Sequence, residues 1–135
     1  MTAEQLIKKQ IIKEFLEIDA DFSLKYGDEP FDKSKLKGDI DEDFDLLYEE
    51  DYIHDAINEF RQTGESTDLP CEWSRHYDSE FVARQLDDGN YVGWTYWSGG
   101  GKHGEPEAID WMSDAKILEV ASEEMVVKRN YKIKE

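Results

Sequence analysis

The spacing of apolar residues divides the chain into a helical first half and a β-rich second half. The segment from Thr2 to Gln5 matches a capping box, a common start of a helix. Apolar residues then recur at steps of three or four, the period of one helix face. They are Ile7, Ile11, Phe15, Ile18 and Phe22. Gly27 is a typical C-terminal stop, so the pattern predicts a helix between Thr2 and Gly27.

A second helix is predicted over residues 49–62. One stripe of this segment is apolar, acids occupy its first turn, and Arg61 lies in its last turn, as the helix dipole favours. The stripe consists of Ile53, Ala56, Ile57 and Phe60. An earlier start near Asp41 is the alternative. Residues 28–38 carry Pro30 and Gly38 and show no period, so we expect a connecting loop there.

The second half has the two-residue period of strands. Residues 63–70 are polar and are interpreted as a linker within one domain. Residues 81–86 and 91–97 flank Asp88-Gly89, which predicts a hairpin with a two-residue type I′ turn. That turn pairs Phe81 with Tyr96, Ala83 with Trp94, and Gln85 with Val92, and places these residues on the face that receives the helices.

Three further elements complete the predicted fold. Pro106 stands at the first position of a short helix that is expected to end near Ala115. Residues 116–120 and 125–133 are strand-like. We therefore predict an α+β fold in which N-terminal helices pack on an antiparallel sheet of about four strands, with one further short helix. Residues 1–135 form a single domain in this interpretation, with an acidic helical half (1–68) and a β-rich half (69–135).

Charge narrows the range of partners. The net charge of the 135 residues is -17, of which -12 belongs to residues 1–68 and -5 to residues 69–135. A chain this negative is repelled by phosphates and by anionic lipids, which argues against direct binding of nucleic acid or membrane. The single cysteine, Cys71, forms no internal disulfide, and the chain shows no signal peptide, so we expect a cytoplasmic protein.

The densest charge lies between Asp39 and Asp55, where 17 residues hold nine carboxylates and no Lys or Arg. In a helix this run has one negative charge per roughly 3 Å, against one per about 1.7 Å on duplex DNA. We expect it to bind a basic partner protein, such as one that itself binds nucleic acid. The predicted partner-binding residues are Asp39, Asp41, Glu42, Asp43, Asp45, Glu49, Glu50, Asp51 and Asp55. A solvated face that only aids solubility is the alternative.

A metal site is not predicted, although the acidic run has some of the spacing of an EF-hand calcium loop. Asp39, Asp41, Asp43, Asp45 and Glu50 occupy positions 1, 3, 5, 7 and 12 of such a loop. The loop requires glycine at position 6, where this chain has Phe44. The sequence also has no recognisable cofactor-binding motif.

A second candidate site is the glycine-rich loop from Ser98 to Glu105. Backbone N–H groups in such a loop could hold an anion or another small molecule, as in a ligand-binding module or a small enzyme. The predicted ligand-binding residues are Trp97, Ser98, Gly99, Gly100, Gly101, Lys102 and His103. The spacing is neither that of a phosphate-binding P-loop nor that of a dinucleotide-binding motif. Alternatively, the glycines only turn the chain and the tryptophans fill the core.

Catalytic residues are sparse. His54, His76 and His103 are scattered, Cys71 has no recognisable nucleophile context, and no set of residues has zinc-ligand spacing. We assign no catalytic residue, and a binding protein is favoured over an enzyme.

Residues 88–112, with the segment Gly93-Trp-Thr-Tyr-Trp-Ser-Gly-Gly-Gly-Lys-His-Gly-Glu-Pro106, resemble short uncharacterised proteins of bacterial and phage genomes. The resemblance covers residues 73–120 and carries no known activity. It implies an accessory protein of a phage or other mobile element. Together with the acidic run, it favours a nucleic-acid mimic that acts as an inhibitor or immunity factor.

Overall fold

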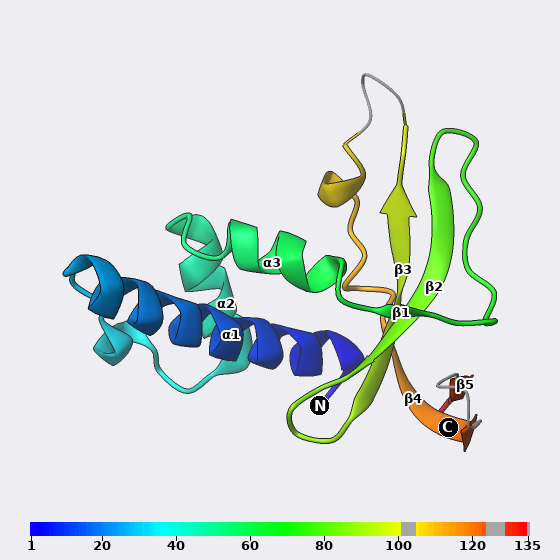
Figure 1. The fold of residues 1–135 in the computed structure, drawn as a ribbon, viewed down its shortest axis with the longest axis horizontal. Helices are drawn as coiled ribbons and strands as arrows, with labels where there is room; N and C mark the ends of the chain where they lie inside the picture. The colour runs from blue at the N-terminus through cyan, green and yellow to red at the C-terminus, as the bar shows by residue number, and fades with distance from the viewer. Residues whose placement is uncertain (101–104, 124–128, 135) are drawn as a thin grey trace.

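The structure is a computed structural model that describes residues 1–100, 105–123 and 129–134. Helices form one side of the molecule and a curled antiparallel sheet stands against them (Figure 1). The helical side contains α1 (Ala3–Tyr26), the 3₁₀ turn η1 (Lys33–Lys35), α2 (Ile40–Glu49) and α3 (His54–Arg61). The strands are β1 (Glu65–Ser66), β2 (Asp78–Gln85), β3 (Tyr91–Ser98), β4 (Lys116–Glu123) and β5 (Arg129–Ile133), in that order across the sheet. The predicted α+β class is confirmed.

The first helix has the predicted ends. The Thr2 side chain accepts a hydrogen bond from the backbone of Gln5, and the Gln5 side chain accepts one from the backbone of Thr2, which completes the capping box. Gly27 ends the helix in the left-handed conformation. The apolar stripe is buried only in its first part, because Ile18 is 54% exposed near the far end of α1.

The predicted second helix, residues 49–62, begins too early, and its alternative start near Asp41 belongs to a separate helix. α2 ends at Glu49 and α3 begins at His54, so residues 49–51 do not form a first helical turn. Asp51 has a φ of 66°, in the left-handed region, and the chain changes direction there. The alternative earlier start corresponds to α2. Ile53, between the two helices, is completely buried and fixes the turn against the core.

The predicted hairpin is confirmed, but its register is shifted by one residue. Phe81 pairs with Thr95 and Ala83 with Gly93, because the turn has three residues instead of two. Gly89 is the third of them and has a φ of 92°, as expected where an ordinary turn is followed by a left-handed residue.

The shifted register also changes the faces of the sheet. Val82 now lies opposite Trp94 on the helix side, whereas Phe81 and Ala83 belong to a separate cluster with Leu118. A Cβ at Gly93 would lie 2.4 Å from the Phe81 ring, so this pairing requires glycine. The predicted face of Phe81, Ala83 and Gln85 is therefore wrong.

Three other predictions need correction. The helix expected up to Ala115 is only the 3₁₀ turn η3 (Pro106–Ala108). Residues 63–70, interpreted as a linker, contain the short edge strand β1, so the sheet has five strands. β4 extends to Glu123, beyond its predicted end. The start of the last predicted strand, up to residue 128, lies outside the described residues.

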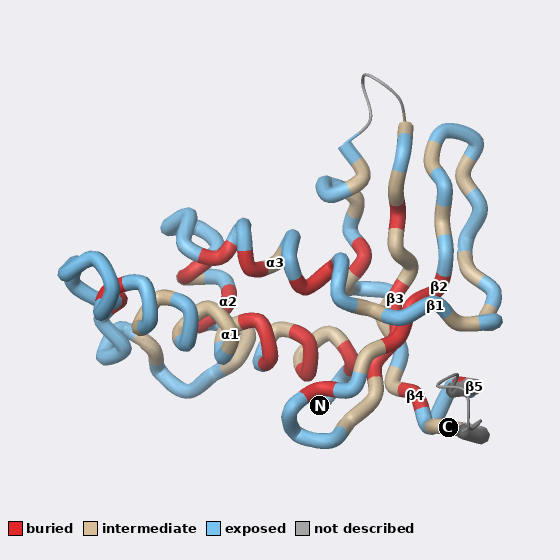
Figure 2. The backbone as a smooth tube through the Cα atoms, in the orientation of Figure 1, coloured by how far each residue is buried: buried red, intermediate tan, exposed pale blue. Residues whose placement is uncertain are grey.

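One continuous core joins the helices to the sheet, and buried positions follow the inner sides of α1 and α3 (Figure 2). At its centre the rings of Phe60 and Trp94 lie 5.1 Å apart, and Trp111 lies 5.9 Å from Phe60. Arg84 of β2 pairs with Glu14 of α1. The two halves recognised in the sequence therefore share both an apolar core and charged contacts.

Candidate functional site

The acidic run lies on α2, on α3 and in the turn that joins them. Its nine carboxylates do not form one line, because the chain changes direction at Asp51. They separate into three groups that differ in their contacts. Asp39, Asp41 and Asp43, here called the inner acids, bind other parts of the chain. Glu42 and Asp45 lie next to lysines. The third group, here called the turn acids, surrounds the α2–α3 turn and consists of Glu49, Glu50, Asp51 and Asp55.

The inner acids hold α2 in place. Asp39 caps the helix by accepting a hydrogen bond from the backbone N–H of Glu42 at 3.0 Å. Asp43 is buried, and its two oxygens accept hydrogen bonds from the backbone N–H groups of Lys37 at 2.8 Å and Gly38 at 3.1 Å. Both of its oxygens are therefore occupied by the loop that precedes α2.

Asp41 connects α2 to α1. It accepts hydrogen bonds from the Gln5 amide at 3.2 Å and from the Lys8 ammonium at 3.3 Å. These two bonds, with the Gln5 bond first, lower the pKa of Asp41 below its ordinary value. Burial of Lys8 works against its charge, but its hydrogen bonds to Glu4 and Asp41 outweigh this effect and raise the pKa of the ammonium.

Glu42, Asp45 and Glu49 share one face of α2 and line a hollow together with Lys35 and Lys37. No ion pair joins these three carboxylates to a Lys or Arg within the part of the chain that the structure describes. The two lysines nevertheless offset part of the negative charge on this side. The predicted partner surface is therefore mixed in charge at Glu42 and Asp45, and also at Glu49, where the same hollow reaches the turn acids.

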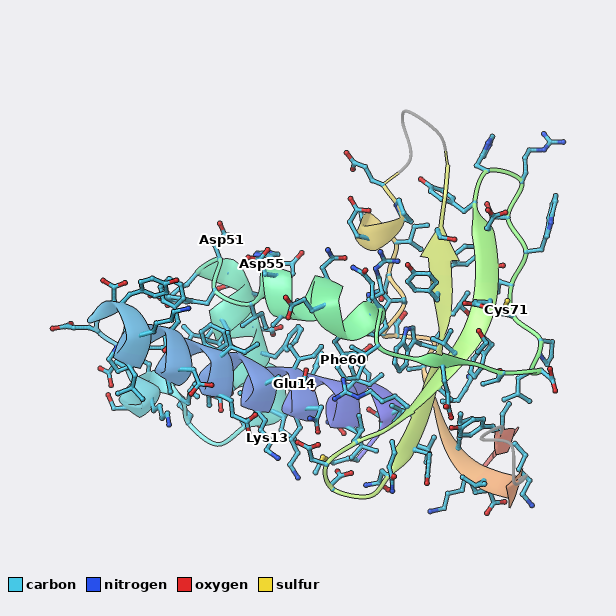
Figure 3. The ribbon with its side chains drawn as sticks, viewed as in Figure 1. Lys13, Glu14, Asp51, Asp55, Phe60 and Cys71 are labelled. Atoms are coloured by element: carbon cyan, nitrogen blue, oxygen red, sulfur yellow. The ribbon has the colours of Figure 1, made fainter. Side chains whose placement is uncertain are left out.

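The turn acids are exposed and form no ion pair with any described Lys or Arg. Asp51 and Asp55 project from the side of the helical half that faces away from α1 (Figure 3). The only charged contact of Asp51 among the described residues is with His54, whose Nδ1 lies 2.6 Å from Oδ1 of Asp51. Of the nine predicted carboxylates, this group is the most available to a partner.

The glycine-rich loop is described only in part. Trp97 is buried, and its carbonyl oxygen accepts a hydrogen bond from the Arg61 guanidinium at 2.6 Å. Gly99 and Gly100 have positive φ values and turn the chain at the end of β3. Beside them, the Asp78 carboxylate lies 3.4 Å from the place of a Cβ on Gly99, which disfavours an anion at this point. Gly101, Lys102 and His103 lie outside the described residues.

A groove between α3 and residues 107–112 was not predicted from the sequence. It has a volume of about 450 Å³, within the usual range of ligand pockets. His54, Ile57, Asn58 and Arg61 line one wall, at the spacing of a single helix face. The other wall runs from Glu107 to Met112, and Tyr48 lies at one end. Pro106 indicated that an element starts here, but no local signal showed that it ends after one turn.

The described residues contain no group of three or more His, Cys, Asp or Glu side chains that could hold a metal ion. Both oxygens of Asp43 bind backbone N–H groups, which conflicts with the calcium-loop spacing. Within the same residues, every helix is too short or too polar to cross a lipid bilayer. Comparison of the chain with protein-family models, curated proteins and solved structures gives no match.

Proposed function

We propose that this protein is an acidic interaction module that binds a basic protein through the turn acids. The observation that carries the proposal is the exposure of Glu49, Glu50, Asp51 and Asp55 around one turn, without an ion pair to any described Lys or Arg. Apart from the contact of Asp51 with His54, carboxylates in this state lose no internal partner among the described residues when they meet a cationic surface. They also attract such a surface over a distance of about 10 Å at moderate salt.

The turn holds these carboxylates in a fixed arrangement. The backbone N–H of Tyr52 donates to the carbonyl of Leu47 at 2.9 Å, and that of Asp51 donates to the carbonyl of Tyr48 at 3.1 Å. Ile53 anchors the end of the turn in the core. A partner therefore orders little additional backbone when it binds, which lowers the entropic cost of association.

A protein that binds nucleic acid is the partner class that this surface suits best, because such proteins present clustered Lys and Arg to closely spaced negative charges. In this role the turn acids occupy the place of phosphates. The protein then acts as a nucleic-acid mimic, in the manner of an inhibitor or immunity factor of a phage or mobile element.

Affinity capture from cell extract at low and at high salt tests the proposal. The bait is the full chain, compared with a triple variant that removes three turn charges, Glu49→Gln, Glu50→Gln and Asp55→Asn. A matched control removes three exposed charges from the β-rich half, Glu72→Gln, Asp88→Asn and Asp114→Asn. Each captured protein is then purified, and its affinity for the three baits is measured with and without duplex DNA as a competitor.

The proposal predicts a basic protein that binds the wild type and the control equally, and the turn variant at least about tenfold more weakly. Duplex DNA is expected to compete for that protein, and high salt to weaken its binding. Equal binding of the turn variant and the control would overturn the proposal, because net charge alone would then account for capture.

A further inference from the structure

The groove between α3 and residues 107–112 combines an apolar floor with an acidic border. Ile57, Ile109, Trp111 and Met112 supply apolar surface, and the Trp111 ring at the base stacks on Phe60 with an interplanar angle of 10°. The floor is therefore rigid and continuous with the core. It provides a place for a large apolar side chain from outside the molecule.

The charges around this groove have one dominant sign. The residues that line it include two carboxylates, Glu107 and Asp110, together with one arginine and His54. The arginine, Arg61, is buried. Its guanidinium donates to the Trp97 carbonyl and lies 4.8 Å from the centre of the Tyr96 ring. Glu107 and Asp110 line the far wall and are exposed, whereas Asp55 stands on α3 outside the lining of the groove.

We infer that the groove binds a segment of the basic partner in which one or two large apolar side chains are flanked by Lys or Arg. This inference rests on the proposed function and adds the site and chemistry of docking. The apolar side chain contacts Ile57 and Met112 in the groove, and the flanking cations approach Glu107 and Asp110 on the far wall. The charge complementarity selects a cationic segment, and the floor selects an apolar anchor within it.

Three synthetic peptides of equal length serve as probes. The first alternates Leu and Lys in a helical amphipathic pattern, the second has Ser in place of every Leu, and the third has Glu in place of every Lys. Fluorescence anisotropy measures the affinity of each labelled peptide for the full chain at low salt. We expect the Leu/Lys peptide to bind at least about tenfold more tightly than the Ser/Lys peptide, and the Leu/Glu peptide not to bind.

Variants then locate the binding. Ala108 is exposed and lines the groove, so Ala108→Trp fills the groove without disturbing the core. This change is expected to weaken binding of the Leu/Lys peptide about tenfold and to leave the affinity for the Ser/Lys peptide unchanged. Gln85→Trp, at an exposed position on β2, is the matched control and is expected to have no effect. Glu107→Lys reverses one charge on the groove wall and is expected to weaken both Lys peptides.

The outcomes separate this inference from the proposed function. Equal affinities of the Leu/Lys and Ser/Lys peptides, or unchanged binding to Ala108→Trp, overturn the groove as the docking site. If the groove is overturned in this way but the triple variant Glu49→Gln, Glu50→Gln, Asp55→Asn binds both Lys peptides more weakly than the wild type, the proposed function stands without the groove. If the triple variant binds both Lys peptides as tightly as the wild type, the proposed role of the turn acids fails instead.

Discussion

The inner acids and the turn acids lie close together in the sequence and have opposite roles in the structure. Asp41 and Asp43 bind α1 and the loop before α2, whereas Glu49 and Glu50 face solvent at the other end of the same helix. The three inner acids fall within residues 39–43 and the four turn acids within residues 49–55, so the two groups are similarly dense in the sequence. Charge density therefore indicates where a chain is acidic, but contacts decide which carboxylates remain available to a partner.

The comparison also explains how such an acidic segment folds. Each inner acid satisfies backbone donors or a cation, so its charge is stabilised by the fold. Apart from the contact of Asp51 with His54, the turn acids have no such compensation among the described residues, and they repel one another. Stability is therefore expected to depend on the inner acids and binding on the turn acids, and substitutions can separate the two properties.

The largest expected effect is that of Asp43→Asn. The substitution preserves the size of the side chain. However, it replaces one carboxylate oxygen by an amide NH₂, which cannot accept the hydrogen bond that a backbone N–H of Lys37 or Gly38 donates there. Hydrogen bonds to a charged group contribute roughly 1.5–3 kcal/mol, so we expect a loss of about 2–3 kcal/mol in the free energy of unfolding. Urea denaturation monitored by circular dichroism measures this change.

Asp45→Asn is the matched control, because Asp45 is exposed, lies two residues further along α2, and accepts no hydrogen bond from the described residues. Its effect is expected to stay within about 0.5 kcal/mol. Equal losses for the two variants would show that the buried contacts of Asp43 do not anchor the loop.

Local signals in the sequence predicted most of the elements correctly. The capping box at Thr2 and the stop at Gly27 define α1, because the hydrogen bonds at its ends are made by neighbouring residues. The Asp88-Gly89 signal located the hairpin, but Gly89 suits a two-residue and a three-residue turn. The alternation of apolar and polar residues did not fix the register either, because β2 has buried residues on both faces and contributes to two separate clusters. The register therefore depended on long-range packing.

The site was less predictable than the fold. Residues 49–53 contain no Gly or Pro, so nothing in the local sequence indicates that the helix breaks at Asp51. The burial of Asp43 depends on the loop at Gly38, and the groove depends on how residues 107–112 pack against α3. These features arise from contacts between separate segments, whereas periodicity and motifs report only on neighbours along the chain.

A smaller effect, with a defined dependence on pH, is expected for Asp41→Asn. Hydrogen bonds from Gln5 and Lys8 hold the pKa of Asp41 below its ordinary value of 3.8 in the folded protein. A carboxylate with a lowered pKa stabilises the fold above the unfolded value, and this contribution is lost as the pH falls through the folded value. The melting temperature of the variant should therefore lie below that of the wild type at pH 7.

The difference in melting temperature between the wild type and Asp41→Asn is expected to shrink as the pH falls below 3.8. Scanning calorimetry across this range measures it, with Asp45→Asn as the control variant. A difference that stays constant with pH would mean that Asp41 contributes through packing and not through its charge.

The smallest effects are expected at the turn acids, and their sign depends on position. Glu49 and Glu50 stand at the C-terminal end of α2, where the helix dipole disfavours negative charge, whereas Asp55 stands in the first turn of α3, where the dipole favours it. Glu49→Gln with Glu50→Gln is therefore expected to raise the free energy of unfolding by up to about 1 kcal/mol at low salt, and Asp55→Asn to lower it by about half as much. Urea denaturation at low and high salt measures both changes, which should diminish as salt screens them. Destabilisation by the Glu49 and Glu50 substitutions would show that these carboxylates have stabilising contacts, and the contrast with the inner acids would then fail.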